Sequence, residues 1–145
     1  MRNPVPLLLA LLAVAGCGSA DPATDNSNDP VIQLAAVPGR PGSGYFDLRI
    51  RGDHGALLSV TSPQAGRIEM HETMMSGNMA SMRPIDRITV RDGEVLSFRP
   101  GGRHLMVYDV HRDVAAGDTV NLVFHFERGG TQSLGAVLRP MGGDI

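Results

Sequence analysis

The sequence predicts an all-β protein, a single domain built as an antiparallel sandwich or barrel, and three observations support this fold class. From residue 31 onward, apolar and polar residues alternate in short runs with a period of two, which is typical of strands with one buried face. Glycine (18 residues) and proline (10 residues) are frequent, which favours turns over long helices. A chain of 145 residues is long enough for one domain with a core and too short for two.

Two of the expected strands show the alternation most clearly. In residues 46–51, Phe46, Leu48 and Ile50 share one face and charged residues occupy the other. In residues 120–126, apolar residues again take every second position. The other expected strands are, in chain order, Val31–Ala36, Ala56–Thr61, Arg67–Glu72, Arg87–Val90, Glu94–Arg99, His104–Val110 and Thr131–Leu138. Turn-forming residues separate them at Gly52-Asp53, Ser62-Pro63, Asp92-Gly93, Pro100-Gly101-Gly102, Ala116-Gly117-Asp118 and Gly129-Gly130.

The methionine-rich segment Met74–Met82 (MMSGNMASM) fits no strand pattern and is interrupted by Gly77. We therefore expect an ordered loop or a single helical turn there. Five of the eight methionines fall within residues 70–82, which makes this the most unusual stretch of the chain.

Residues 1–16 have the layout of a secretory signal peptide, in which Arg2 precedes an apolar run too short to span a bilayer. Cys17 follows the sequence VAG and resembles the lipid-modified cysteine of a bacterial lipobox. An ordinary signal peptide with a chance cysteine is the alternative. Residues 17–30 would then be the acylated cysteine and a polar, flexible tether, residues 31–139 the folded domain and residues 140–145 a short tail.

Lipid on Cys17 would hold the folded domain at the periplasmic face of a membrane in the bacterial cell envelope. The residue after the cysteine is Gly18 rather than Asp, which by resemblance to enterobacterial sorting favours the outer membrane.

Composition excludes several classes of function. A net charge of −2 provides no basic surface for nucleic acid. All 13 basic residues are arginine, which excludes lysine Schiff bases and a P-loop. A single cysteine excludes a disulfide framework and a cysteine-based zinc site. The scattered carboxylates indicate no acid–base pair, and no nucleophile-elbow motif is present.

Four residues form a spaced set of possible metal ligands: His71, Met82, His104 and Met106. His104 and Met106 are two apart on an expected strand, so they should project from the same face. His71 lies at the end of another expected strand, and the methionine-rich segment could bring Met82 toward them. Two imidazoles and two thioethers make a neutral donor set that prefers Cu(I) to Mg, Ca or Zn.

The spacing His-x10-Met-x21-His-x-Met resembles that of the periplasmic copper chaperone family PCu(A)C, without a gap. The surrounding sequences are similar as well. They are residues 62–73 (SPQAGRIEMHET), residues 82–84 (MRP), residues 100–106 (PGGRHLM) and residues 122–127 (LVFHFE). The resemblance covers residues 31–138 and implies a cupredoxin-like, Greek-key β-sandwich with these four residues as Cu(I) ligands.

The resemblance also implies a function: to bind Cu(I) outside the cytoplasm and deliver it to a cuproenzyme. The expected recipient is the dinuclear copper centre of cytochrome c oxidase, or a thioredoxin-like assembly partner, and the protein is expected to be a monomer. A copper-buffering or resistance protein without a dedicated recipient is the alternative. An electron-transfer cupredoxin would need a cysteine ligand within the fold, and a four-ligand site leaves no open position for an enzyme substrate.

The remaining methionines and histidines have simpler interpretations. Met70 alternates onto the face of Ile68 and is expected in the core. Met74, Met75 and Met79 are either packing residues or accessory soft donors at the rim of the site. The other histidines are expected to be solvated and to bind no metal: they are His54, His111 and His125.

Overall fold

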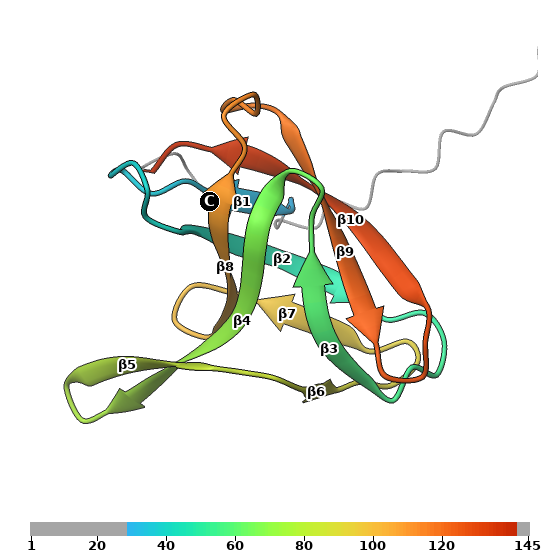
Figure 1. The fold of residues 1–145 in the computed structure, drawn as a ribbon. Coiled ribbons are helices and arrows are strands. Elements are labelled where there is room, and N and C mark those ends of the chain that lie inside the picture. The colour runs from blue at the N-terminus through green and yellow to red at the C-terminus, as the bar shows by residue number, and fades with distance from the viewer. Residues whose placement is uncertain (1–28, 142–145) are drawn as a thin grey trace, which may run out of the picture.

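The computed structural model of the protein describes residues 29–141 (Figure 1). Within this range the regular structure consists of strands alone. These are β1 (Val31–Gln33), β2 (Gly42–Arg49), β3 (Ala56–Thr61), β4 (Ala65–Ser76), β5 (Met79–Pro84), β6 (Ile88–Thr89), β7 (Val95–Phe98), β8 (Arg103–Val110), β9 (Thr119–Phe126) and β10 (Thr131–Arg139). A helix able to span a membrane is not found in the described residues. The predicted signal peptide, Cys17 and nearly all of the tether lie outside the described residues, as does most of the predicted tail.

The strands form one continuous ladder in the order β5-β4-β8-β2-β1-β10-β9-β3-β6, and β7 pairs with β2 beside this path. Nearly all neighbours are antiparallel. The exception is β1, which pairs with β10 in parallel and with β2 in antiparallel fashion. The predicted all-β class is therefore confirmed, but the sheet is mixed rather than purely antiparallel. The parallel pair joins the two ends of the domain, so no hairpin connection dictates its direction.

The ladder curls into an open sandwich around one apolar core. Phe46 on β2 stacks on Phe98 with ring centroids 4.6 Å apart and meets Phe124 on β9 edge-on at 5.4 Å. Since β2 and β9 are not neighbours in the ladder, the second contact shows that two layers face each other across the core. The alternation predicted for these strands is confirmed, because their apolar residues at every second position are buried.

The prediction for the methionine-rich segment is wrong. Residues 74–82 form neither a loop nor a helical turn but most of the β4–β5 hairpin, which projects from the body of the sandwich (Figure 1). The connection is the two-residue turn Gly77-Asn78, between the paired Ser76 and Met79. Gly77 has a φ of 60°, as the first central residue of a tight hairpin turn of type II′ requires. Gly77 thus creates the hairpin instead of breaking a strand.

Candidate metal centre

The register of β4 and β8 brings the two candidate histidines together. His71 lies directly opposite His104, and Glu69 lies opposite Met106. The imidazole centroids of the histidines are 6.0 Å apart, with their planes inclined at 38°. Because directly opposed residues share a face, and residues two apart on a strand do too, His71, His104 and Met106 project from the same side of the sheet.

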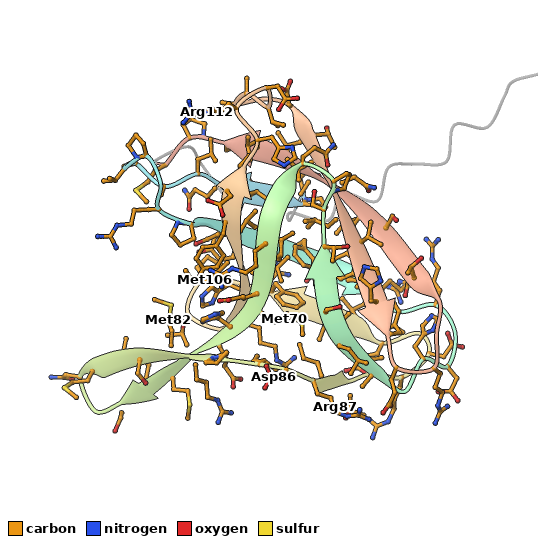
Figure 2. All side chains as sticks on the ribbon, viewed as in Figure 1. Met70, Met82, Asp86, Arg87, Met106 and Arg112 are labelled. Atoms are coloured by element: carbon orange, nitrogen blue, oxygen red, sulfur yellow. The ribbon has the colours of Figure 1, made fainter. Side chains whose placement is uncertain are left out.

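Met82 reaches the same face from β5. It pairs with Thr73, which is two residues beyond His71 on β4 and so has the same orientation. Figure 2 shows the Met82 and Met106 side chains in the angle between β5 and β8. All four residues predicted from the spacing therefore share one face of the three-stranded β5-β4-β8 region. A strand pairing, rather than a folded-back loop, carries Met82 there.

The four candidate donors differ in exposure. His104 retains only 6% of its accessible surface, and the side chain of His71 retains 14%. Met106 is half-buried, whereas Met82 is 62% exposed. The set thus has a buried imidazole end and an open thioether end.

The His104 ring is oriented by the loop that precedes its strand. Its Nδ1 lies 3.1 Å from the carbonyl oxygen of Gly102. A carbonyl oxygen only accepts, so Nδ1 carries the hydrogen and Nε2 keeps a free lone pair. The same carbonyl accepts the backbone N–H of Thr73 at 3.0 Å. Gly102 therefore links His104 to the base of the β4–β5 hairpin.

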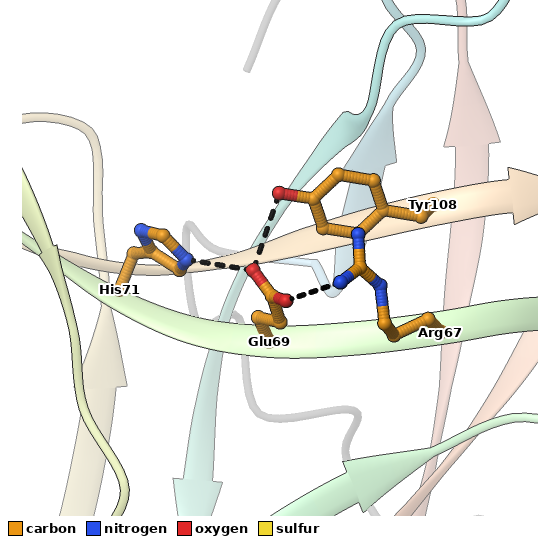
Figure 3. A network of polar contacts seen from close by, with 4 residues as sticks. All are labelled: Arg67, Glu69, His71 and Tyr108. Carbon is orange, nitrogen blue, oxygen red and sulfur yellow. Dashed lines mark hydrogen bonds and ion pairs between the residues drawn. The ribbon is translucent and has the colours of Figure 1, made fainter.

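His71 belongs to a polar network with Glu69, Tyr108 and Arg67 (Figure 3). The Nε2 of His71 lies 3.0 Å from Oε2 of Glu69, and the Tyr108 hydroxyl donates to the same oxygen at 3.2 Å. Arg67 pairs with the other carboxylate oxygen at 2.8 Å, and its guanidinium lies 4.0 Å from the centre of the Tyr108 ring.

The contacts of this network shift the pKa values of Glu69 and Tyr108 in opposite directions. The hydrogen bond from His71, the hydrogen bond from Tyr108 and the charge of Arg67 together lower the pKa of the Glu69 carboxyl, against an opposing effect of burial. Burial, and next the contact with Glu69, raises the pKa of the Tyr108 phenol. Glu69 is therefore an ionised acceptor and Tyr108 a protonated donor at neutral pH.

The other ring nitrogen of His71, Nδ1, is buried and has no hydrogen-bond partner among residues 29–141. Among the described residues, no group of three or more histidine, cysteine or acidic side chains is arranged to hold a metal ion. The chemistry of this face accordingly depends on two imidazoles, each with one free nitrogen, and two thioethers.

The further methionines separate by face. Met70 is buried in the core, as predicted. Met75 is on the candidate face, since it is two residues beyond Thr73, and it is the diagonal neighbour of Met82. Met74 and Met79 alternate onto the opposite face of the hairpin. Of the three possible accessory donors, the register therefore brings only Met75 to the candidate site.

The three other histidines lie outside this face. The ring of His54 stacks on Phe126 at 4.2 Å and hydrogen-bonds the Arg51 carbonyl, so it is a packing residue rather than the solvated side chain we expected. His125 contacts the Thr61 hydroxyl at 2.7 Å. His111 is exposed, as predicted.

Sequence reasoning missed the roles of Glu69, Tyr108 and Gly102. The spacing of Glu69 and His71, two apart on a strand, indicated a shared face. The partnership with Tyr108 depends on the register of β4 and β8, in which Tyr108 lies opposite Arg67, and the sequence carries no direct signal for that register.

Comparisons with known proteins relate the chain to a lipoprotein family. The family model described as "Putative lipoprotein LpqE-like" matches residues 27–137. The chain is 33% identical over 85 residues to the uncharacterized protein RP573 of Rickettsia prowazekii, a match that covers 57% of the chain and 47% of that protein, less than half its length. It is 24% identical over 143 residues to the putative lipoprotein Lxx21020 of Leifsonia xyli, covering 92% and 86% of the two chains.

Two solved structures share the fold. The copper-bound PCuAC domain from PmoF2 superposes with a TM-score of 0.58 at 17% identity, covering 78% of this chain and 90% of that domain. The solution structure of CuI-DR1885 from Deinococcus radiodurans also gives 0.58, at 22% identity, with 86% and 85% covered. The chain therefore has a PCuAC-type fold.

Proposed function

The chain belongs to the LpqE-like lipoprotein family, and on that premise we propose that it binds one Cu(I) ion at His71, Met82, His104 and Met106 and carries it in the cell envelope. The observation that carries the proposal is the strand register, which collects these four side chains on one face of β5, β4 and β8. The copper-bound state named for both solved neighbours supports the same conclusion.

The donor set accounts for the choice of metal. Thioether sulfur is a soft ligand that suits Cu(I), and imidazole binds copper as well. Zn(II) and the harder cations gain little from two thioethers. We therefore expect binding of Cu(I) and Ag(I) to be much tighter than binding of Zn(II) at these residues.

The exposure gradient suits a carrier. The buried imidazoles give the ion a firm attachment, and exposed Met82 lies where a recipient's donor can approach. Copper can then pass by stepwise ligand exchange, with the most exposed donor replaced first. A set of four protein donors leaves no position for a substrate, so the protein is proposed not to be an enzyme.

The anchor and the recipient belong to this proposal too. Lipid on Cys17 would keep a monomeric domain at the periplasmic face of a membrane, with the outer membrane favoured by Gly18. Delivery to the dinuclear copper centre of cytochrome c oxidase, or to a thioredoxin-like partner that assembles it, is the proposed destination. Copper buffering without a recipient is the alternative, and a copper-transfer assay with the oxidase subunit distinguishes the two.

The decisive experiment is an anaerobic Cu(I) titration against a chromophoric competitor. The protein should bind one ion, and the double variant His104→Ala/Met106→Ala should lose it. The variant His111→Ala/Met141→Ala is the matched control, since it removes the same residue types from exposed positions outside the site. An unchanged stoichiometry in the first variant would refute the site assignment.

The anchor is tested separately. Cys17→Ser should release the protein from membranes without altering copper affinity, because the tether separates Cys17 from the site. Continued sedimentation of the Cys17→Ser protein with membranes would show that the lipobox interpretation is wrong.

A further inference from the structure

We infer that Glu69 is a positioning residue that determines which nitrogen of His71 binds copper, so that His71 binds through Nδ1 while His104 binds through Nε2. The inference rests on the proposed function and adds to it an outer residue and a specific pair of ligand atoms.

The first step is the assignment of the His71 hydrogen. Nε2 lies 3.0 Å from Oε2 of Glu69. An ionised carboxylate can only accept, so in the neutral ring Nε2 carries the hydrogen and Nδ1 is the basic nitrogen. A metal binds the unprotonated nitrogen of a neutral imidazole, and the hydrogen bond at the other nitrogen decides which one that is.

The second step is that Glu69 itself is held in place. Arg67 contacts Oε1 of Glu69 at 2.8 Å, and the Tyr108 hydroxyl contacts Oε2 at 3.2 Å. Each carboxylate oxygen therefore has a partner other than His71. Arg67 also packs over the Tyr108 ring (Figure 3). A carboxylate fixed from two strands can fix the imidazole in turn, whereas a freely rotating one could not.

The third step is the state of Nδ1. Buried polar atoms nearly always have a partner, and this nitrogen has none in the described structure. An ion bound on the candidate face would supply that partner. Nδ1 of His71 is thus a buried acceptor without a donor, on the face where the other three candidate ligands lie.

The two histidines therefore present different nitrogens. His104 has its Nδ1 hydrogen bound to the Gly102 carbonyl and offers Nε2. His71 has its Nε2 hydrogen bound to Glu69 and offers Nδ1. A carboxylate on a ligand ring also makes the coordinating nitrogen more basic and partly offsets the charge of the bound ion.

Nitrogen NMR of the imidazole rings tests this in the ¹⁵N-labelled protein without any variant. Long-range ¹H–¹⁵N correlations report which nitrogen of each ring carries the hydrogen. We expect the Nε2–H form for His71 and the Nδ1–H form for His104. On addition of Cu(I), the His71 Nδ1 resonance and the His104 Nε2 resonance should shift, while the His71 Nε2 hydrogen remains.

Glu69→Gln then tests the cause. Glutamine keeps the size of the side chain but loses its charge and can donate as well as accept, so His71 should become a mixture of both tautomers. Cu(I) affinity should fall about 10- to 100-fold. Glu72→Gln is the matched control: Glu72 is as exposed as Glu69 (32% against 34%) and is paired with Arg83 instead of a histidine. It should leave the tautomer and the affinity unchanged.

Tyr108→Phe is the second variant. It removes one hydrogen bond to Glu69 and keeps the ring under Arg67. We therefore expect smaller changes in the His71 tautomer ratio and in the Cu(I) affinity than Glu69→Gln causes. Copper bound through Nε2 of His71, or an unchanged tautomer in Glu69→Gln, would overturn the inference while leaving the copper carrier intact. Loss of the whole proposed function would instead appear as a parent protein that binds no Cu(I).

Discussion

In the body of the sandwich, Phe46, Phe98 and Phe124 are completely buried, whereas in the β4–β5 hairpin Met75, Met79 and Met82 are more than 60% exposed. Both regions are β-structure and both are rich in apolar side chains. The body buries those side chains in a shared core. The hairpin projects from the body as a two-stranded ribbon (Figure 1), and its methionines are exposed to solvent.

The difference shows that apolar character serves two purposes in one chain. Burial of aromatic side chains stabilises the fold. Exposed methionines contribute little to folding, so their use is better explained by soft sulfur on a flexible side chain. The candidate site joins both regions, because β8 in the body supplies His104 and Met106, β5 in the hairpin supplies Met82, and β4, which belongs to both, supplies His71.

The largest expected effect is on the body. Phe46→Ala should reduce the free energy of unfolding by about 3–5 kcal/mol, because it opens a cavity between Phe98 and Phe124. Chemical denaturation monitored by circular dichroism would measure the loss. A reduction below about 1 kcal/mol would mean that the body is not the source of stability.

Met82→Ala should weaken copper binding and leave the stability of the fold nearly unchanged. We expect Cu(I) affinity to fall about 100-fold, or about 2.7 kcal/mol. A direct ligand should contribute at least as much to affinity as Glu69, which only contacts a ligand. The free energy of unfolding should change by less than about 0.5 kcal/mol, because the side chain is exposed. Met79→Ala, on the other face, is the control and should change neither quantity.

Acidity should act on the two histidine donors alone, His71 and His104. A proton competes with Cu(I) for each imidazole, while a thioether has no proton to exchange. Cu(I) affinity should therefore fall as the solution is acidified, and the limiting slope should approach about two protons displaced per ion. His71→Met should reduce that number to about one. Equal pH slopes in the two proteins would mean that His71 is not a ligand.

Gly77→Ala should weaken the hairpin without affecting the body. The substitution costs about 1 kcal/mol, because an L-residue is strained at the positive φ of Gly77. A Cβ at this position would meet no atom within 4 Å, so the strain is of the backbone alone. Faster hydrogen exchange of the β4–β5 amides, with unchanged exchange in β9 and β10, would show that only the hairpin is weakened. Gly77→Asn should recover part of the loss, since asparagine tolerates this conformation better.

The smallest effect separates the two faces of the hairpin. Met75 and Met79 are similarly exposed, at 66% and 75%, but only Met75 shares the face of Met82. Met75→Ala should slow copper transfer to a competitor chelator by about threefold, whereas Met79→Ala should not, because an adaptable sulfur near the open end of the site assists exchange. Stopped-flow absorbance would measure the transfer rates of the two variants, and equal rates would show that Met75 is not part of the site.

The sequence predicted those strands that have one buried face. Phe46, Leu48 and Ile50 were placed correctly because burial on one side requires alternation. The hairpin was missed because both of its faces are exposed, so its residues show no alternation. The Gly77-Asn78 pair was nevertheless a recognisable two-residue turn signal.

The candidate site was predicted less completely than the fold. The spacing correctly indicated that His104 and Met106 share a face, and the structure adds His71 and Met82 to that face. The contact between Glu69 and Tyr108 could not be predicted, because it depends on the offset of β4 against β8. Strand offsets are set by packing of the whole sheet and not by local sequence.

The position of β1 in the strand order has a consequence for the timing of folding. β1 contains the first residues of the domain, yet it lies in the middle of the ladder, between β2 and the last strand, β10. Until a ribosome has passed Arg139, the chain lacks the strand that joins the half bearing β4, β5 and β8 to the half bearing β9, β3 and β6. Completion of the sandwich must therefore await the synthesis of β10, and until then the growing chain lacks the β1–β10 pairing although all four candidate donors have already been made.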